Sequence, residues 1–391
     1  MHLYNTASRR LETSTWARDV HIYVCGITPY DAAHMGHIFT FVTYDILSRY
    51  LEYQGHRVKL VRNITDVDEP IYTRAQELGI PYMQLARDET AHFQEVLQQL
   101  DFLPAFAEPR ASDYIEAMAA AVKRLLDNGH AYRLANGDIY FDVSTFPRFG
   151  KQSGFTRRLQ TAFMASRGGD PERLDKRHPF DFLLWRAVPD TDDPARWESV
   201  VGTGRPGWHI ECSVMSSDLL GTPIDIHGGG MDLIFPHHEA ETAQSESLSA
   251  YPFVRHWMHV APLYCYGEKM SKSLGNLVFA GDLLAHHDPA VIRLALLQYH
   301  YRIGGEWHGD VLTKAKEQLG LFKRALATRS GPSPALYLEH FFSAMDDDLD
   351  TPEALHVLHH LAWDTVKKGG SDSQAPAKLA ELLGLLGIQL A

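Results

Sequence analysis

In the N-terminal third of the chain, the pattern of apolar and polar residues predicts alternating strands and helices. Apolar runs at 20–26 and 58–65 have the length and composition of buried strands. Between them, residues 38–53 carry apolar side chains at helical spacing. Further helices are expected near residues 67–78, 82–100 and 112–128. This alternation predicts a doubly wound parallel sheet of α/β type.

The pattern changes over about residues 129–200, where we expect an insertion into the α/β unit. Residues 132–134 and 139–143 indicate a hairpin across a short Asn-Gly turn, and an irregular polar stretch follows. Strand-like runs then return at 223–227 and 254–261. The insertion therefore divides one nucleotide-binding sheet into two halves along the sequence.

The C-terminal part of the chain has a helical pattern. Asp288 and Pro289 suit an N-cap and a first helical position, and a further helix start is expected at Thr351. An acidic run at 346–348 is interpreted as a solvated turn. The expected domains are a catalytic α/β domain over 1–310 and a small all-α unit over 311–391.

Composition narrows the class of protein. The 391 residues are 45% hydrophobic and 22% charged, which is enough for a large core and a second unit. A formal net charge of −12 provides no overall basic field for nucleic acid. No apolar leader or membrane-length apolar run occurs. Cys25, Cys212 and Cys265 are too few and too scattered for a disulfide framework, so a reduced cytoplasm is expected.

Two short motifs on opposite sides of the sequence suit phosphate chemistry. Residues 34–37 (His-Met-Gly-His) open a predicted helix directly after a strand, where free N–H groups and the helix dipole favour phosphate. Residues 269–273 (Lys-Met-Ser-Lys-Ser) carry two ammonium groups on a predicted loop. Either motif alone has a plain alternative, a surface His pair or a solvated basic loop. Together they resemble the ATP-binding motifs of class I aminoacyl-adenylate-forming enzymes, and the candidate catalytic residues are His34, His37, Lys269 and Lys272.

A second set of residues offers metal ligands. Cys25 ends the first predicted strand, Cys212 lies in a separate polar run, and His237 and Glu241 are spaced to share one helix face. Thiolate, imidazole and carboxylate are ligands that zinc accepts. Spacing alone leaves open the alternative that these cysteines are simply buried.

Several further runs resemble the cysteinyl-tRNA synthetase superfamily, and the resemblance covers essentially the whole chain. These runs are 23–26, 63–68, 206–212, 225–230 and 235–239. The resemblance implies a class I synthetase-type (Rossmann-like) catalytic domain in which one zinc ion per chain takes the thiolate of the substrate cysteine. A serine hydroxyl replaces that soft ligand poorly, which would select cysteine without editing. The implied zinc ligands are Cys25, Cys212 and His237, with Glu241 as a candidate fourth.

Local departures from the synthetase pattern are similar to the cysteine ligases of mycothiol biosynthesis. The first motif ends in His37 rather than Asn, and Glu69 and Pro70 replace the usual Asp and Lys. The run 166–171 and an end without an expected anticodon-binding domain are also ligase-like, whereas Glu241 is more synthetase-like. The resemblance thus implies that cysteine is joined to the amine of glucosaminyl-inositol. The alternatives are a cysteinyl-tRNA synthetase, a truncated relative with another acceptor, and a non-catalytic paralogue.

The implied reaction has two steps. The cysteine carboxylate attacks the α-phosphate of Mg-bound ATP to give cysteinyl-AMP, and the acceptor amine then displaces AMP. The resemblance implies these contacts to ATP and the adenylate: Cys25, Gly26, Ile27, Thr28, Thr40, Asn63, Ile64, Thr65, Trp208, Gly230, Met231, Asp232, Leu263 and Lys272. Thr40, Trp208 and Leu263 have the alternative of ordinary packing. Asp232 is expected to bind the substrate ammonium rather than to cap a turn.

The expected partners are small molecules: L-cysteine, ATP with Mg²⁺, and glucosaminyl-inositol. Zn²⁺ is the expected cofactor. Neither tRNA nor a membrane is an expected partner, and the chain is expected to be a monomer or a homodimer.

Overall fold

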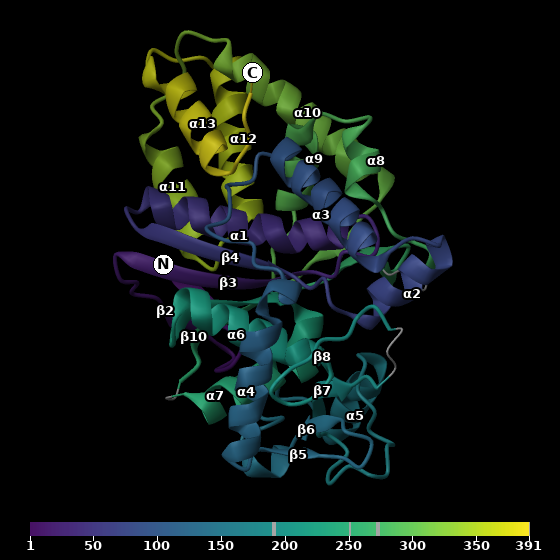
Figure 1. Cartoon of the computed structure of the whole chain (residues 1–391). Coiled ribbons are helices and arrows are strands. Elements are labelled where there is room, and N and C mark those ends of the chain that lie inside the picture. The colour runs from purple at the N-terminus through teal and green to yellow at the C-terminus, as the bar shows by residue number, and fades with distance from the viewer. Residues whose placement is uncertain (190–192, 250–251, 271–273, 391) are drawn as a thin grey trace.

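A parallel four-stranded sheet forms the centre of the molecule. The structure is a computed structural model that describes the chain except for residues 190–192, 250–251, 271–273 and 391 (Figure 1). The strand order is β10–β9–β3–β4, and every neighbouring pair is parallel. The strands are β3 (Asp19–Ile27), β4 (Arg57–Ile64), β9 (Ile224–Gly230) and β10 (Val254–Val260). All four lie where the apolar runs predicted strands.

Alternating side chains of β3 face two different helix layers. Val20, Ile22 and Val24 pack in one core with α1 (Met35–Tyr53). Tyr23 and Cys25 point to the other core, with α6 (Trp208–Leu220). Figure 1 shows α1 and α6 on opposite faces of the sheet. The predicted doubly wound arrangement is therefore confirmed, since period-two alternation on a central strand requires a cover on both faces.

The remaining helices of the N-terminal half also lie where periodicity predicted them. They are α2 (Glu69–Leu78), α3 (Tyr82–Gln99) and α4 (Ile115–Asp127), the last preceded by a short 3-10 turn, η1 (Ala111–Tyr114). Asp68 caps α2 by accepting a hydrogen bond from the backbone N–H of Glu69, with Pro70 in the first turn. Gly79 ends the helix in the left-handed conformation.

The region from 131 to 206 is more regular than the sequence indicated. The expected hairpin is present as β5 (Ala131–Arg133) and β6 (Ile139–Phe141), and β7 (Phe182–Ala187) and β8 (Gly204–Pro206) extend it into an antiparallel sheet. A helix, α5 (Arg157–Ser166), and a 3-10 turn, η2 (Val143–Thr145), lie between its strands. The expectation of an irregular stretch to about residue 200 was therefore wrong.

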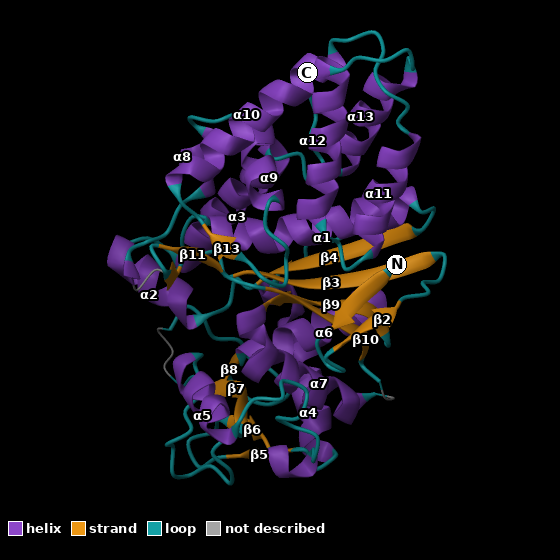
Figure 2. Ribbon diagram, turned by 180° about the vertical axis from the view of Figure 1, so that it is seen from behind, coloured by secondary structure: helices purple, strands orange, loops and turns teal. Residues whose placement is uncertain are grey.

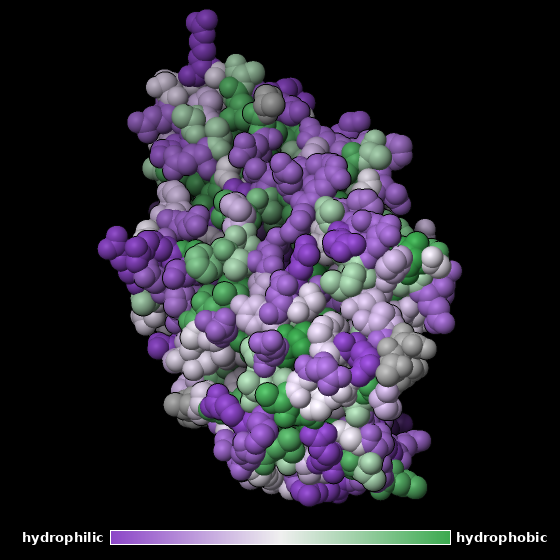
Figure 3. All heavy atoms as spheres, viewed as in Figure 1, coloured by the Kyte–Doolittle hydropathy of each residue, from purple (hydrophilic) through white to green (hydrophobic). Residues whose placement is uncertain are grey.

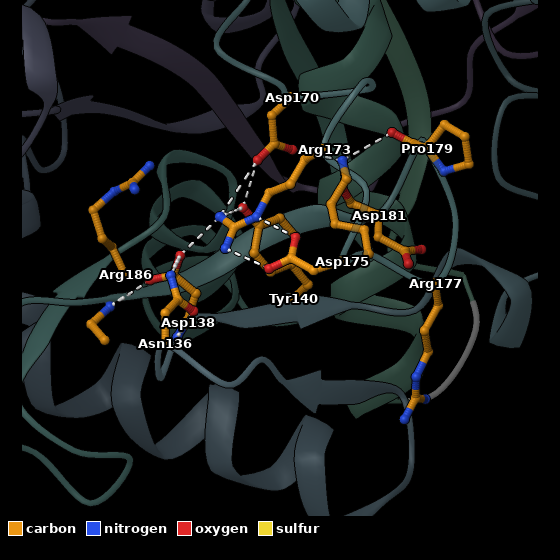
Figure 4. A network of polar contacts seen from close by, with 12 residues as sticks. Asn136, Asp138, Tyr140, Asp170, Arg173, Asp175, Arg177, Pro179, Asp181 and Arg186 are labelled. Atoms are coloured by element: carbon orange, nitrogen blue, oxygen red, sulfur yellow. Dashed lines mark hydrogen bonds and ion pairs between the residues drawn. The ribbon is translucent and has the colours of Figure 1, made fainter.

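Polar contacts explain why apolar periodicity missed this order. Figure 4 shows Arg173 reaching Asp138 at 3.0 Å and Asp175 at 2.7 Å. The buried Lys176 donates to Asp170 at 2.6 Å and to the carbonyl of Pro179 at 3.0 Å. Such a network orders a segment without leaving a hydrophobic repeat in the sequence.

Helices dominate the C-terminal part of the chain, as expected (Figure 2). They are α8 (Ala280–Leu284), α9 (Pro289–Leu297), α10 (Gly309–Leu326), α11 (Ala335–Asp346), α12 (Thr351–Lys367) and α13 (Gln374–Leu385). The short strands outside the two main sheets are β1 (His2–Asn5), β2 (Arg10–Thr13), β11 (Leu263–Cys265), β12 (Glu268–Lys269) and β13 (Gly305–Glu306). None of the helices in the described part of the chain combines the length and apolarity that crossing a bilayer needs. Hydrophilic and hydrophobic residues are interspersed on the face in Figure 3.

Only part of the acidic run at 346–348 is the solvated turn that we expected, because Asp347 is exposed whereas Asp348 is not. Asp348 is buried and accepts hydrogen bonds from the backbone N–H of Tyr4 at 2.8 Å and the hydroxyl of Tyr301 at 2.6 Å. Arg302 also pairs with its carboxylate. Asp348 therefore ties the N-terminal strand to the helical unit, a tertiary role that charge density alone does not reveal.

One buried arginine joins three parts of the chain. Arg293 in α9 is 1% exposed and pairs with Asp45 of α1 at 2.5 Å. It also donates to the carbonyls of Leu100 at 3.0 Å and Leu386 at 3.2 Å. The helical unit is thus attached to the sheet domain by a charge that has no contact with water.

We expect Arg293→Met to lower the free energy of unfolding by about 3 kcal/mol, because removing one partner of a buried pair leaves polar groups unpaired. Chemical denaturation measures the change. The control is Arg57→Met, which breaks an Arg–Asp pair whose side chains are 65% and 41% exposed; it should change stability far less. Equal losses in the two variants would contradict this account.

Candidate active site

The carboxyl ends of β3 and β4 form a closely packed strand-end pair. A Cβ atom on Gly26 would lie 1.6 Å from the carbonyl oxygen of Asn63, so only glycine fits there. The N–H of Gly26 donates to Oδ1 of Asn63 at 2.9 Å, and Nδ2 of Asn63 donates to Oγ1 of Thr65 at 3.0 Å. The N–H of Thr65 donates to the carbonyl of Ile27 at 2.9 Å, with Ile64 ending β4 between them. These predicted contact residues therefore meet at the edge where open α/β sheets bind ligands.

A buried group of sulfur, nitrogen and oxygen donors adjoins this edge. Ligand atoms of Cys25, His237, His238 and Glu241 all lie within 4.8 Å of one another. The sulfur of Cys212 lies 3.7 Å from that of Cys25. All five side chains are buried. The structure thus brings together the four predicted zinc-ligand residues and adds His238, which the sequence reasoning had missed.

In both His237 and His238, the Nδ1 atom contacts a further histidine, which is a different one in each case. Nδ1 of His237 lies 2.9 Å from Nδ1 of His209, and Nδ1 of His238 lies 2.6 Å from Nε2 of His259. The carboxylate of Glu241 is held in turn by Nε2 of His227 at 2.9 Å. A layer of imidazoles therefore orients the donor group, as supporting residues do around protein metal ions.

Burial makes this donor group suited to a cation. It raises the pKa of Cys25 and of Glu241 well above their usual values and lowers the pKa of His237 and His238 well below theirs. Nε2 of His237 is buried without a hydrogen bond, although it lies 3.2 Å from Oε1 of Glu241. A divalent cation would restore the charged forms of thiol and carboxyl and give that nitrogen a partner. The donor set fits zinc.

The first phosphate motif starts α1. Nδ1 of His34 accepts from the N–H of Gly36 at 3.1 Å, so this side chain caps the helix. The rings of His34 and His37 are stacked with centroids 3.7 Å apart. The N–H of Met35 donates to the carbonyl of Val278 at 2.8 Å. That contact joins the helix start to the segment that follows the lysine motif.

The second motif is described only in part. Lys269 lies on β12, pairs with Tyr264 of β11, and places its ammonium 3.1 Å from the carboxylate of Asp232. Lys272 lies within 271–273, outside the described residues. Burial raises the pKa of Asp232, but the charge and hydrogen bond of Lys269 outweigh this and hold that pKa below its usual value. Asp232 is therefore an anion that faces the lysine motif.

The loop after β9 connects this anion to the sheet. A short turn, η3 (Met231–Leu233), follows Gly230, where a Cβ atom would lie 2.5 Å from Oδ1 of Asp232. The segment η4 (Ile234–His238) then leads into α7 (Glu239–Leu248), so one continuous run carries Asp232 and the donor histidines. Leu263 is buried and its carbonyl accepts from Met270 at 3.0 Å, beside the lysine strand.

Three other predicted contacts have mixed surroundings. Thr28 donates a hydrogen bond to the carboxyl of Asp68. The ring of Trp208, at the start of α6, lies 4.3 Å from the ring of His237. Thr40 donates to a carbonyl one turn earlier in its own helix, at 3.2 Å. Thr28 and Trp208 therefore adjoin the strand-end site, whereas the hydrogen bond of Thr40 is local to α1.

Glu211 is a further buried acid that the sequence reasoning had missed. It precedes Cys212 in α6 and is 0% exposed, and burial raises its pKa well above its usual value. The only sequence signal for its burial was its position in a run that faces the core. Cys265 is buried and lies on β11.

Comparison with known proteins agrees with this geometry. A family profile described as "tRNA synthetases class I (C) catalytic domain" matches residues 12–317, and one described as "DALR domain" matches 340–390. The structure of Mycobacterium tuberculosis methionyl-tRNA synthetase in complex with methionyl-adenylate superposes with a TM-score of 0.66. That match covers 95% of this chain and 90% of the other at 17% identity, so it shows the fold alone.

Closer relatives are similar over the full length. The L-cysteine:1D-myo-inositol 2-amino-2-deoxy-alpha-D-glucopyranoside ligase of Saccharopolyspora erythraea is 42% identical over 396 residues, which cover 100% of this chain and 96% of the relative. The protein of that name in Gordonia bronchialis is 43% identical over 397 residues, with the same coverage. The sheet and the profile match define a class I synthetase-type catalytic domain. Within that class, the chain belongs to the family of L-cysteine:1D-myo-inositol 2-amino-2-deoxy-alpha-D-glucopyranoside ligases.

The paired imidazoles generate a pH prediction. Burial lowers the pKa of His34 to about 3 and that of His37 to about 4. Both rings should therefore remain neutral in NMR titrations down to about pH 5, whereas free imidazole titrates near about 6.5. Because the unfolded chain binds these protons more readily, their contribution to folding stability should fall as the pH drops below about 6.5. Protonation of either ring above about pH 5 in the folded protein would contradict this assignment.

Proposed function

We propose that this chain activates L-cysteine with ATP and transfers the cysteinyl group to the amine of glucosaminyl-inositol, forming an amide. The observation that carries the proposal is the buried Cys/His/Glu donor group beside the two phosphate motifs, because it pairs sulfur recognition with carboxylate activation. The names of the full-length relatives supply the acceptor. The acceptor amine is a better nucleophile than a hydroxyl, so the second step needs little beyond positioning and removal of a proton.

For the first step, we assign to the two motifs the role of stabilising the negative charge of the phosphates. The cysteine carboxylate attacks the α-phosphorus, and the bond to pyrophosphate breaks. Nε2 of neutral His34 and a ring N–H of His37 can donate to the phosphate oxygens as charge grows. Lys269 and Lys272 would hold the β- and γ-phosphates, with Mg²⁺ bound to ATP. Lys269 must leave Asp232 to do so, which would free that carboxylate for the substrate ammonium.

We assign the metal to Cys25, Cys212 and His237, with Glu241 or His238 as the remaining protein donor. When bound, zinc would supply a soft Lewis-acid position for the thiolate of the substrate cysteine. Trp208, packed on His237, would close the side of that position and exclude water. Serine would be rejected because its hydroxyl is a much poorer ligand than a thiolate. We place the reaction in the cytoplasm, since all three cysteines are free thiols.

The activity itself is the first test. Purified protein with ATP and cysteine should catalyse ATP–pyrophosphate exchange and should form an amide when glucosaminyl-inositol is added. Serine should support exchange at least about a hundredfold more weakly than cysteine. Product with tRNA and none with the amino sugar would replace this acceptor with the synthetase alternative. Absence of cysteine-dependent exchange would overturn the proposal in favour of a non-catalytic paralogue.

The zinc assignment is tested by a matched pair of cysteine variants. Cys212→Ala should lose both the bound metal and cysteine-dependent exchange, because it removes a thiolate ligand. Cys265→Ala, which changes a buried cysteine outside the donor group, should keep both. Metal content by elemental mass spectrometry and exchange rates give the answer. A metal-free Cys212→Ala protein with full exchange activity would exclude a zinc-dependent mechanism.

A further inference from the structure

A cavity of about 710 Å³ lies along α2 and takes no part in the activation step described above. It lies between α2, the start of α3 and the segment before β8. We call it the α2 cavity. Its lining residues include Glu69, Tyr72, Thr73, Tyr82, Asp193 and Arg205. The volume falls in the range of small-molecule sites.

The chemistry of the walls suits a polyhydroxylated ligand. Tyr72 and Tyr82 pack edge to face with ring centroids 4.9 Å apart and provide flat apolar surface. The guanidinium of Arg205 lies 4.9 Å from the centre of the Tyr72 ring. Two carboxylates hold it there, Glu69 at 2.7 Å and Asp193 at 2.9 Å. Fixed donors and acceptors beside aromatic faces match ring hydroxyls, which both donate and accept hydrogen bonds.

One carboxyl links the cavity to the adenylate end of the sheet. Asp68 is the N-cap of α2, next to the cavity residue Glu69, and it also accepts a hydrogen bond from Thr28 at the end of β3. The hydroxyl of Tyr72 is buried without a hydrogen-bond partner, and burial raises its pKa, with smaller contributions from the charges of Glu211 and Asp68. Tyr72 therefore lies between the α2 cavity and the acids behind the strand ends.

We propose that the α2 cavity binds the acceptor as a polyhydroxylated amine, with its ammonium group beside Asp68. The inference rests on the proposed function, because it assigns a place to the second substrate of that reaction. The ring hydroxyls would contact Glu69, Arg205 and Asp193, and the tyrosine faces would pack on the sugar or cyclitol ring. The amine would then approach the carbonyl carbon of cysteinyl-AMP from the Thr28 side.

Asp68 takes a proton from the bound ammonium, which frees the nitrogen lone pair. The nitrogen forms a bond with the carbonyl carbon, the C–O bond to phosphate breaks, and its electron pair leaves with AMP. The second nitrogen proton passes to solvent as the amide forms. Burial raises the pKa of Asp68 to about 6, although the hydrogen bond from Glu69 opposes the shift. Asp68 is therefore a stronger base than an exposed carboxylate and is still ionised near neutral pH.

A steric variant tests occupancy of the α2 cavity without touching its ion pairs. Thr73 is exposed on α2 and lines the cavity, whereas Glu77 is exposed on the same helix and is not among the lining residues. Thr73→Trp should raise the KM for glucosaminyl-inositol by about tenfold or more, equivalent to about 1.4 kcal/mol of lost binding. Glu77→Trp should leave it unchanged. Equal acceptor KM values in the two variants would overturn the proposal.

A charge variant tests the place of the amine. Asp68→Asn keeps an N-cap side chain and removes the carboxylate. The ratio of the transfer rate to the ATP–pyrophosphate exchange rate should fall about a hundredfold, the usual contribution of a positioned base. Equal loss of both rates would show that Asp68 only supports Thr28 and would overturn its role. Wild-type protein that exchanges but does not transfer to the amino sugar would instead refute the proposed function, so the two failures are distinguishable.

Discussion

Burying ionisable side chains is costly unless each one has a partner, and this constraint governs the centre of the molecule. Cys25, Cys212, His237, His238 and Glu241 are enclosed between the sheet, α6 and α7. Behind them, the ring of His209 contacts His237 and the ring of His259 contacts His238. The ring of His227 contacts the carboxylate of Glu241. Burial keeps such a group neutral, and a divalent cation would compensate its charged form. This set of buried donors suits a ligand with positive charge.

The rest of the chain positions the strand ends and the two phosphate motifs next to that centre. The ends of β3 and β4 approach so closely at Gly26 and Asn63 that only glycine fits there, which fixes the strand ends beside the donor group. The contact between Met35 and Val278 brings the lysine motif to the start of α1. Arg293 and Asp348 attach the helical unit to α1 and to β1. The buried pairs thus position elements that are far apart in the sequence around one strand-end site.

Two substrates of different character would then enter from different sides. The nucleotide is matched by imidazoles and ammonium groups at a helix start, where the field favours anions. The α2 cavity offers carboxylates, a guanidinium and tyrosines, which favour a hydroxylated cation. Asp68, which accepts a hydrogen bond from Thr28, would lie where the two meet. This division explains how one domain can activate a carboxylate and then present it to an amine without a large rearrangement.

Sequence patterns predicted the parts of this arrangement that depend on local periodicity. The strands at 20–26 and 58–65, the helix cap at Asp288 and the helix start at Thr351 follow from apolar spacing and capping chemistry. The sheet around Arg173 was missed because ion pairs order it.

Tertiary contacts account for the other differences. Asp348 was misjudged because its partners are Tyr4 and Tyr301, far away in the sequence. His238 was missed although it lies three residues before Glu241, a spacing that also places two side chains on one helix face. Spacing alone does not rank the i,i+3 pair of His238 and Glu241 against the i,i+4 pair of His237 and Glu241.

The central claim is that the buried donor group holds a metal that recognises the sulfur of the substrate. Zinc K-edge X-ray absorption on the zinc-loaded protein tests it directly. The account predicts sulfur neighbours from Cys25 and Cys212 in the free protein and one additional sulfur at about 2.3 Å after cysteine is added, but not after serine. A zinc coordination shell without sulfur, or one that cysteine leaves unchanged, would contradict it.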